Sequence, residues 1–227
     1  MAKRDHVRNV FGDLLDAVSP ARCPGCGHLG VLVCDTCAAT LAPAPVVAPP
    51  PPLAWWTACF AYQGVARELV ARAKYRAERR FLTLLARELA VALERAPPFD
   101  RVTWAPASAQ RIRAQGVDHG EVLARTVAGL VGTRVAPCLV RAPGAAQTGR
   151  DASARRAGPG LRAVGPVSGV VILVVDDVAT TGGTLAAGAR ALLQAGASEV
   201  LAATIALTPG PGTRSRGPAY TPGYSDR

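Results

Sequence analysis

The stretch Gly169–Thr184, which reads GVVILVVDDVATTGGT, constrains the fold more than any other part of the chain. Its first seven residues are glycine or apolar, which is typical of a strand buried on both faces of a parallel sheet. Two carboxylates, Asp176 and Asp177, follow, and then a loop rich in threonine and glycine. Ligands of open α/β sheets bind at the carboxyl ends of the strands. We therefore expect a strand over 169–175, a helix over about 183–195, and a ligand site between them.

The loop at residues 180–184, TTGGT, has the composition of an anion cradle. Its hydroxyls and unhindered main-chain N–H groups would meet a ligand at the start of a helix, where the helix dipole also favours negative charge. The two glycines let the backbone approach the ligand closely. No lysine follows them, which excludes a Walker A loop. The alternative is a helix capped by Thr180 or Thr181, with two incidental acids before it.

The two acids narrow the class of ligand. Beside an anion cradle they would repel a simple phosphate, so they make sense if they bind hydroxyls, a metal ion or both. A phosphorylated sugar offers a phosphate for the loop and a vicinal diol for Asp176 and Asp177. Incidental carboxylates at the end of a buried strand would be costly. The pattern therefore favours a phosphorylated sugar.

The rest of the chain alternates between strand and helix patterns. The helical stripe is clearest where Phe81, Leu85, Leu89 and Leu93 recur every fourth residue. Strands separated by helices predict a doubly wound α/β fold with a parallel sheet. The expected strands are 55–62, 101–105, 134–140, 169–175 and 199–207, and the expected helices are 9–18, 65–73, 79–95, 119–131 and 183–195.

Four of the six cysteines form the pattern C-x2-C-x7-C-x2-C. Cytosolic proteins seldom keep disulfides, so paired CxxC motifs favour a metal. Four thiolates complete the tetrahedron that Zn²⁺ prefers and leave no position for water, so the site would be structural. A redox dithiol pair and free thiols are the alternatives. The expected zinc ligands are Cys23, Cys26, Cys34 and Cys37, while Cys59 and Cys138 are expected to be small buried hydrophobic residues.

Composition divides the chain into four parts. Residues 41–53, LAPAPVVAPPPPL, contain six prolines and predict a semi-rigid linker. Residues 141–162 hold five arginines and have no hydrophobic period. This stretch could close over a pyrophosphate, contact a nucleic-acid backbone or be solvated. The expected division is an N-terminal helix and zinc knuckle over 1–40, the linker over 41–53, an α/β domain over 54–207 and a flexible tail over 208–227.

The chain carries 26 basic and 16 acidic residues, which give a formal net charge of +10. This charge favours a polyanionic partner, either nucleic acid or a phosphorylated small molecule. A generally arginine-rich proteome is the alternative. No run approaches the roughly 18–20 apolar residues of a membrane span. The first residues mix charges with apolar side chains, unlike a signal peptide. The sequence predicts a soluble cytoplasmic protein.

The motif VVDDVATTGGT resembles the phosphoribosyl pyrophosphate (PRPP) motif of the type I phosphoribosyltransferases. With the four-cysteine knuckle in front and Lys74-Tyr75 between, residues 20–207 resemble the ComF/GntX group of competence proteins. The resemblance implies a type I phosphoribosyltransferase-like doubly wound sheet with a hood. It implies that Asp176 and Asp177 are the catalytic residues and hold the ribose hydroxyls, with Mg²⁺ bridging the diol and the pyrophosphate. The implied PRPP-binding residues are Val178, Ala179, Thr180, Thr181, Gly182, Gly183, Thr184 and Lys74.

Lys74 has an alternative role as an exposed lysine at the end of a helix. The chain also departs from the family pattern. An Arg-Gly-Phe-Asn-Gln-like stretch is replaced by residues 115–119, QGVDH, with Arg111 and Arg113 close by. In the arginine-rich stretch, Gln147 is followed by arginines but not by the usual asparagine.

The resemblance implies Mg²⁺-dependent transfer of a phosphoribosyl group from PRPP to an acceptor, with release of pyrophosphate. The alternative is a non-enzymatic adaptor that handles single-stranded DNA for the competence machinery. The resemblance implies this role because ComF proteins are associated with DNA uptake. Binding of single strands normally uses stacked aromatic side chains beside basic groups. The one aromatic cluster is Trp55, Trp56 and Tyr62, which also fits core packing.

Overall fold

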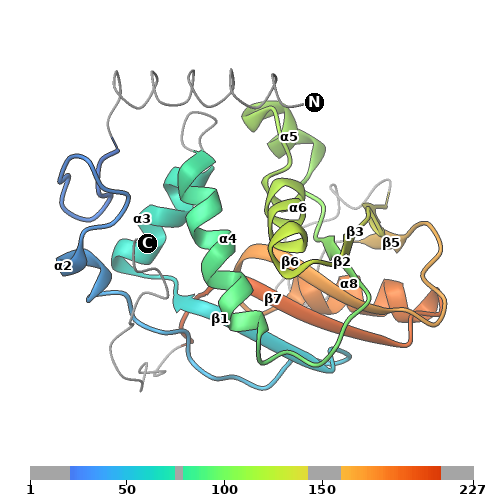
Figure 1. Ribbon diagram of the computed structural model, residues 1–227. Coiled ribbons are helices and arrows are strands. Elements are labelled where there is room, and N and C mark those ends of the chain that lie inside the picture. The colour runs from blue at the N-terminus through green and yellow to red at the C-terminus, as the bar shows by residue number, and fades with distance from the viewer. Residues whose placement is uncertain (1–20, 75–78, 143–159, 211–227) are drawn as a thin grey trace.

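The computed structural model describes residues 21–74, 79–142 and 160–210 (Figure 1). Within them, five strands form a parallel sheet in the order β1-β7-β6-β2-β3, and β4 pairs antiparallel with β5 in a second, two-stranded sheet. The strands are β1 (Trp55–Ala61), β2 (Arg101–Trp104), β3 (Arg134–Val135), β4 (Leu139–Arg141), β5 (Leu161–Ala163), β6 (Val171–Ala179) and β7 (Glu199–Leu207). The helices are α2 (Asp35–Ala38), α3 (Gly64–Ala73), α4 (Arg79–Leu93), α5 (Ala109–Gln115), α6 (His119–Val131) and α8 (Gly183–Gln194).

The parallel sheet is covered on both faces. Helices α3, α4 and α6 lie on one face and α8 lies on the other (Figure 1). The side chains of the central strand β6 pack alternately into two hydrophobic cores, one on each face of the sheet. Leu173 and Val175 lie in the core under α3, α4 and α6, and Ile172 and Val174 lie in the core under α8. All four side chains are fully buried, as alternation between two covered faces requires. The doubly wound α/β sheet predicted from the sequence is confirmed.

The strand that precedes the threonine-rich loop is longer than expected. The sequence predicts its end at Val175, but β6 continues through both aspartates to Ala179. The reason is its neighbour β7, whose backbone pairs with β6 from Asp176 opposite Thr204 to Ala179 opposite Leu207. The two aspartates therefore lie within the last four residues of a strand rather than in a loop after it.

The prediction of a single strand over 134–140 is wrong, because the structure has two short strands there, in two different sheets. β3 pairs with β2, whereas β4 pairs with β5. Pro137 lies between them and has no N–H to donate to a sheet. The next residue, Cys138, donates its N–H to the hydroxyl of Thr103 instead of to a strand. The short helix α5 was also not expected, and the side chain of Ser108 caps its start.

Other expectations fall outside the described residues. They are the helix at 9–18, most of the arginine-rich stretch 141–162, and the end of the tail from residue 211 onward. Among the described helices, none has the length and apolar character needed to cross a membrane.

The proline-rich segment 41–53 lies along the edge of the sheet. Ala44 donates its N–H to the carbonyl of Cys59, and Ala61 donates to the carbonyl of Ala42, so the segment pairs with β1. Leu41 and Leu53, at its two ends, are buried. The segment therefore connects the cysteine-rich region to the sheet through direct contacts.

Candidate functional site

The two aspartates of β6 point to different faces of the sheet. Because side chains alternate along a strand, Asp177 follows Val175 toward α3, α4 and α6, and Asp176 follows Val174 toward the other face. Asp177 accepts a hydrogen bond from the N–H of Val178 at 2.7 Å, and Asp176 accepts one from the N–H of Asp177 at 2.8 Å. These local bonds hold both carboxylates at the carboxyl end of the strand.

Lys74 forms an ion pair with Asp177. Its Nζ lies 2.7 Å from Oδ2 of the aspartate, and the two side chains are 29% and 24% exposed. Lys74 is the residue at which α3 ends, so a residue about a hundred positions earlier in the chain is brought to the end of β6. Lys74 thus lies at the end of a helix, as the alternative expects, but its side chain is half-buried and paired with Asp177.

His119 completes this side of the site. It begins α6, and the main chain of Lys74 lies beside its imidazole. Burial lowers the pKa of His119, so the ring is neutral at physiological pH, and its Nδ1 has no hydrogen-bond partner. A cavity of about 20 Å³, room for about one water molecule, is bounded by Lys74, His119, Asp177 and apolar side chains.

Asp176 carries an unusual protonation state. Burial, followed by the charge of Asp177, raises its pKa to about 8, although Asp177's N–H, Lys74 and Arg111 act in the opposite direction. At pH 7 in the ligand-free protein, Asp176 is thus mainly a neutral acid, whereas Asp177 is the carboxylate that pairs with Lys74. A neutral acid beside a carboxylate offers both a donor and an acceptor to neighbouring hydroxyls.

The raised pKa of Asp176 yields a prediction about stability. A carboxyl group whose pKa is higher in the folded protein than in the unfolded chain stabilises the fold below its unfolded pKa of about 4. That stability is lost as the pH rises toward 8. We expect Asp176→Asn to raise the melting temperature of the ligand-free protein at pH 7.5 by a few degrees, since 1 kcal/mol corresponds to about 2–4 °C for a chain of this size.

Thermal unfolding between pH 4 and pH 8 measures this effect. The gain over the wild type should grow with pH, and the exposed control Glu121→Gln should show no such trend. A melting temperature for Asp176→Asn equal to that of the wild type at every pH would contradict the assignment.

Two arginines face Asp176. Arg111 lies on α5 and Arg141 at the end of β4, and both interact electrostatically with this aspartate. Arg141 donates from Nε to the carbonyl of Pro106 at 2.9 Å, and burial, followed by the charge of Arg111, lowers the pKa of its guanidinium. In the sequence, Arg141 is one of the five arginines of residues 141–162, a stretch that could close over a pyrophosphate, and Arg111 lies close to the position where the family pattern has an arginine.

Asp118 has a structural role here. One of its carboxylate oxygens caps α6 at the N–H of Gly120, and the other accepts the N–H of Ala107, each at 3.0 Å. It thereby fixes the start of α6 to the loop that leads into α5. This contact determines where Arg111 and His119 lie around the two aspartates.

The threonine- and glycine-rich loop joins β6 to α8. Gly182 is the N-cap of α8, with a positive φ of 72°, and no side chain caps the helix. The alternative in which Thr180 or Thr181 caps it is wrong; both threonines are exposed. The N–H groups of the first turn therefore have no side-chain acceptor and can bind an anion.

Gly182 is also enclosed. A Cβ at this position would lie 2.7 Å from Cγ of Pro50 and 3.5 Å from the ring of Trp56. The proline-rich segment and β1 thus form one wall of the loop. Trp55, Trp56 and Tyr62 are partly buried and pack against the two cores, so the aromatic cluster does not form an exposed stacking surface.

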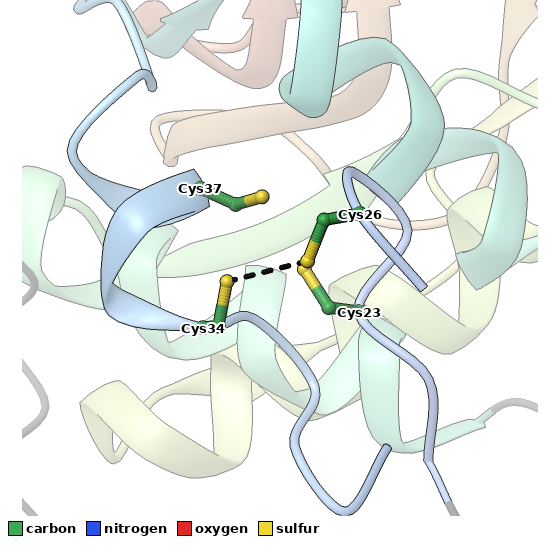
Figure 2. Close-up of side chains that lie close together, drawn as sticks. All are labelled: Cys23, Cys26, Cys34 and Cys37. Carbon is green, nitrogen blue, oxygen red and sulfur yellow. Dashed lines mark hydrogen bonds between the residues drawn. The ribbon is translucent and has the colours of Figure 1, made fainter. Parts of the chain in front are cut away.

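The four clustered cysteines converge on one point (Figure 2). Their sulfur atoms all lie within 4.8 Å of one another, and Sγ of Cys26 is 3.5 Å from Sγ of Cys34. Four sulfurs around Zn²⁺ at about 2.3 Å would lie about 3.8 Å apart. The donor set and its size therefore fit a structural zinc ion. Cys138 is buried as predicted, and Cys59 is half-buried.

Main-chain N–H groups around the cluster favour a thiolate, the form of cysteine that binds a metal. Burial raises the pKa of Cys23, but N–H groups of Cys34, Cys26 and Gly25 outweigh it and bring the pKa to about 6. The pKa of Cys37 rises to about 12, first because it shares a hydrogen bond with Cys23 and then because of burial. The main-chain N–H groups thus favour a thiolate at Cys23. A zinc ion would stabilise thiolates at all four positions.

Comparison with known proteins agrees with this architecture. Residues 115–221 match the family described as phosphoribosyl transferase domain. Two curated relatives, the ribose-phosphate pyrophosphokinases of Prochlorococcus marinus (strain MIT 9313) and Parasynechococcus marenigrum (strain WH8102), are each 30% identical over 105 residues. The match covers 46% of this chain and 32% of each relative, so this chain spans about a third of their length.

Solved structures of related proteins align over parts of the chain. Glutamine PRPP amidotransferase from B. subtilis is 26% identical over 54% of this chain and 25% of its own, with a TM-score of 0.38. Purine phosphoribosyltransferase from Pyrococcus horikoshii is 17% identical over 60% of this chain and 80% of its own, with a TM-score of 0.39. The family match covers a little under half of the chain. It runs through β6, the threonine- and glycine-rich loop, α8 and β7 of the covered parallel sheet, and the four-cysteine cluster lies before it in the chain.

Proposed function

We propose that this protein binds PRPP and transfers its phosphoribosyl group to an acceptor, releasing pyrophosphate. The observation that carries the proposal is the pair Asp176 and Asp177 at the end of β6, one loop away from the uncapped start of α8. The loop offers main-chain donors for the 5′-phosphate, and the two acids offer partners for the ribose hydroxyls. The phosphoribosyl transferase family match over 115–221 supports the same ligand.

The cations around the aspartates suit the other end of PRPP. Lys74 and Arg111 act electrostatically on Asp176, and Arg111 in turn faces Arg141. Such a group would attract the pyrophosphate and stabilise the charge that develops on it as it leaves. In the proposed reaction the bond from C1′ to the pyrophosphate oxygen breaks, and a bond from the nucleophilic atom of the acceptor to C1′ forms.

The residues also fit a role for Mg²⁺. The carboxyl oxygens of Asp176 and Asp177 are ligands of the kind that Mg²⁺ prefers, directly or through the ribose hydroxyls that they bind. When bound, the ion would neutralise charge on the pyrophosphate. The protein's own residues position the sugar between the α8 loop and the cations, so that C1′ is presented to the acceptor.

Lys74 would change partners on binding. In the ligand-free protein its ammonium group is paired with Asp177, which occupies an oxygen that a ribose hydroxyl would need. When the hydroxyl takes that place, Lys74 is free to bind a pyrophosphate oxygen. The ion pair thus keeps the lysine next to the site before the ligand arrives.

Removing this lysine should weaken binding of PRPP. A hydrogen bond to a charged group contributes about 1.5–3 kcal/mol, so we expect Lys74→Met to raise the dissociation constant about 10- to 100-fold. Lys74→Arg should recover part of the loss, and Arg125→Met, which removes an exposed arginine paired with Glu121, should have no effect. Calorimetric titration with PRPP measures each value. Wild-type affinity in Lys74→Met would contradict the pyrophosphate contact.

A calorimetric titration of the zinc-loaded protein with PRPP and Mg²⁺ tests the proposed function. We expect saturable binding of one PRPP per chain, weakened when Mg²⁺ is omitted. A screen of nitrogen nucleophiles for pyrophosphate release then identifies the acceptor. Absence of heat and saturation would overturn the proposal.

A second candidate function is handling of single-stranded DNA in the cytoplasm, as in the ComF/GntX competence proteins that the motif order resembles. The net charge of +10 supports it. This function predicts single-strand affinity that falls steeply with salt concentration. No binding at low salt would eliminate it.

A further inference from the structure

A hollow of about 600 Å³ lies between the cysteine cluster and helices α3 and α4. We call it the knuckle hollow. No residue of the described part of the chain fills it, and it lies apart from the threonine-rich loop of the proposed PRPP site. Apolar side chains line much of it, namely Leu32, Val33 and Leu41 from the knuckle side and Leu69, Leu84 and Leu85 from the helices. The polar side chains of His28, Asp35 and Glu88 line the rest.

The described chain begins at the rim of this hollow. Gly30, which lines the hollow, donates its N–H to the carbonyl of Ala21 at 2.8 Å, and Arg22 pairs antiparallel with Leu29. Ala21 itself is buried. The described part of the chain therefore starts next to the hollow.

Those residues have an apolar stripe at helical spacing. Six apolar side chains recur at intervals of three and one, which places them on one face of a helix. A helix over 7–18 would be about 18 Å long. A helix of this length is only marginally stable in water without a partner for its apolar face. The stripe consists of Val7, Val10, Phe11, Leu14, Leu15 and Val18.

We propose that residues 7–18 form an amphipathic helix whose apolar face fills the knuckle hollow. Only Ser19 and Pro20 separate Val18 from Ala21, so the short tether keeps the local concentration of the stripe high. The helix would bury the apolar walls of the hollow and join the cysteine cluster to α4. The proposal concerns packing within the chain and is independent of PRPP binding.

Site-specific photo-crosslinking locates the helix directly. The zinc-loaded full chain carries Phe11→p-benzoyl-phenylalanine, and isotopically labelled and unlabelled chains are mixed before irradiation. We expect crosslinks within one chain to residues 28–41 or 84–88. Crosslinks elsewhere in the chain would overturn the proposal. Crosslinks between labelled and unlabelled chains would also overturn it, and would identify a second copy as the occupant.

A pair of charge variants gives an independent test. Leu14→Asp/Leu15→Asp places two carboxylates in the stripe, and Asn9→Asp/Gly12→Asp places two on the opposite face. We expect amide exchange over 28–41 to accelerate at least tenfold in the first variant, with increased binding of the dye 8-anilinonaphthalene-sulfonate. The second variant should match the wild type. Equal exchange and equal dye binding in all three proteins would overturn the proposal. Charges in the stripe would then not change access to the hollow, so the stripe would not be what fills it.

Discussion

The variant Asp176→Asn/Asp177→Asn is expected to lose PRPP binding, with affinity reduced by more than about 100-fold. Each carboxyl group is expected to bind a ribose hydroxyl, and a hydrogen bond to a charged group contributes about 1.5–3 kcal/mol. Asparagine keeps the size of the side chain but removes the negative charge of Asp177 and the proton of Asp176. Lys74 would also lose its partner at 2.7 Å. Calorimetric titration with PRPP and Mg²⁺ measures the loss.

Misfolding could also abolish PRPP binding, and the stability of the same variant without ligand distinguishes the two causes. Because burial raises the pKa of Asp176 to about 8, its replacement should offset the loss of the ion pair between Asp177 and Lys74, so the double variant should remain folded. A stable variant that does not bind PRPP would therefore locate the ribose site. The exposed control Glu121→Gln should bind normally. Intact PRPP binding in the double variant would contradict the site.

The second large effect is expected on removing the metal ligands. In Cys37→Ser, zinc should be lost and the region from Ala21 to Leu41 should unfold, because zinc contributes on the order of 10 kcal/mol to the folding of comparable small metal sites. This region contains one helix of four residues and few buried side chains, so little else stabilises it. Zinc content per chain and proteolysis within 21–41 measure the outcome.

Unfolding of the zinc knuckle should also weaken PRPP binding at the proposed site. A Cβ at Gly25 would lie 2.7 Å from Sγ of Cys37 and 2.8 Å from Val65, so the cluster packs on the start of α3. The other end of α3 leads into Lys74, which is paired with Asp177. We expect Cys37→Ser to weaken PRPP binding about 5- to 10-fold, at the lower end of the 1–3 kcal/mol that typically couples linked sites.

A cysteine outside the cluster provides the matched control. Cys138→Ala removes a buried thiol on the opposite core, and it should retain one zinc ion per chain and normal PRPP binding. Unchanged zinc content in Cys37→Ser would contradict the four-cysteine site. A wild-type protein whose knuckle is stabilised by oxidation and not by zinc would favour a dithiol pair instead.

Local pattern was enough for much of this protein. The apolar run before Asp176 predicted a doubly covered parallel strand, and β6 and β7 confirm it. The spacing of Phe81, Leu85 and Leu89 predicted α4. The four cysteines predicted a cluster, because two CxxC turns bring their sulfurs together over a short length of chain.

Contacts between distant segments were beyond the sequence. Pairing with β7 extended β6 through both aspartates, and pairing partners in different sheets separated β3 from β4. The ion pair of Lys74 with Asp177, the arginines facing Asp176 and the wall that Pro50 forms against Gly182 all join residues far apart in the chain.

The sequence by itself thus determined most of the elements and the clustering of the four cysteines, because composition and short-range spacing specify strands, helices and closely spaced metal ligands. Only the tertiary structure decided what surrounds them. Burial and the neighbouring Asp177 make Asp176 a neutral acid near pH 7, and the end of α3 places Lys74 against the second carboxylate. Protonation and ion pairing depend on distances and burial, which arise only when the chain brings α3, α5, β4 and β6 together.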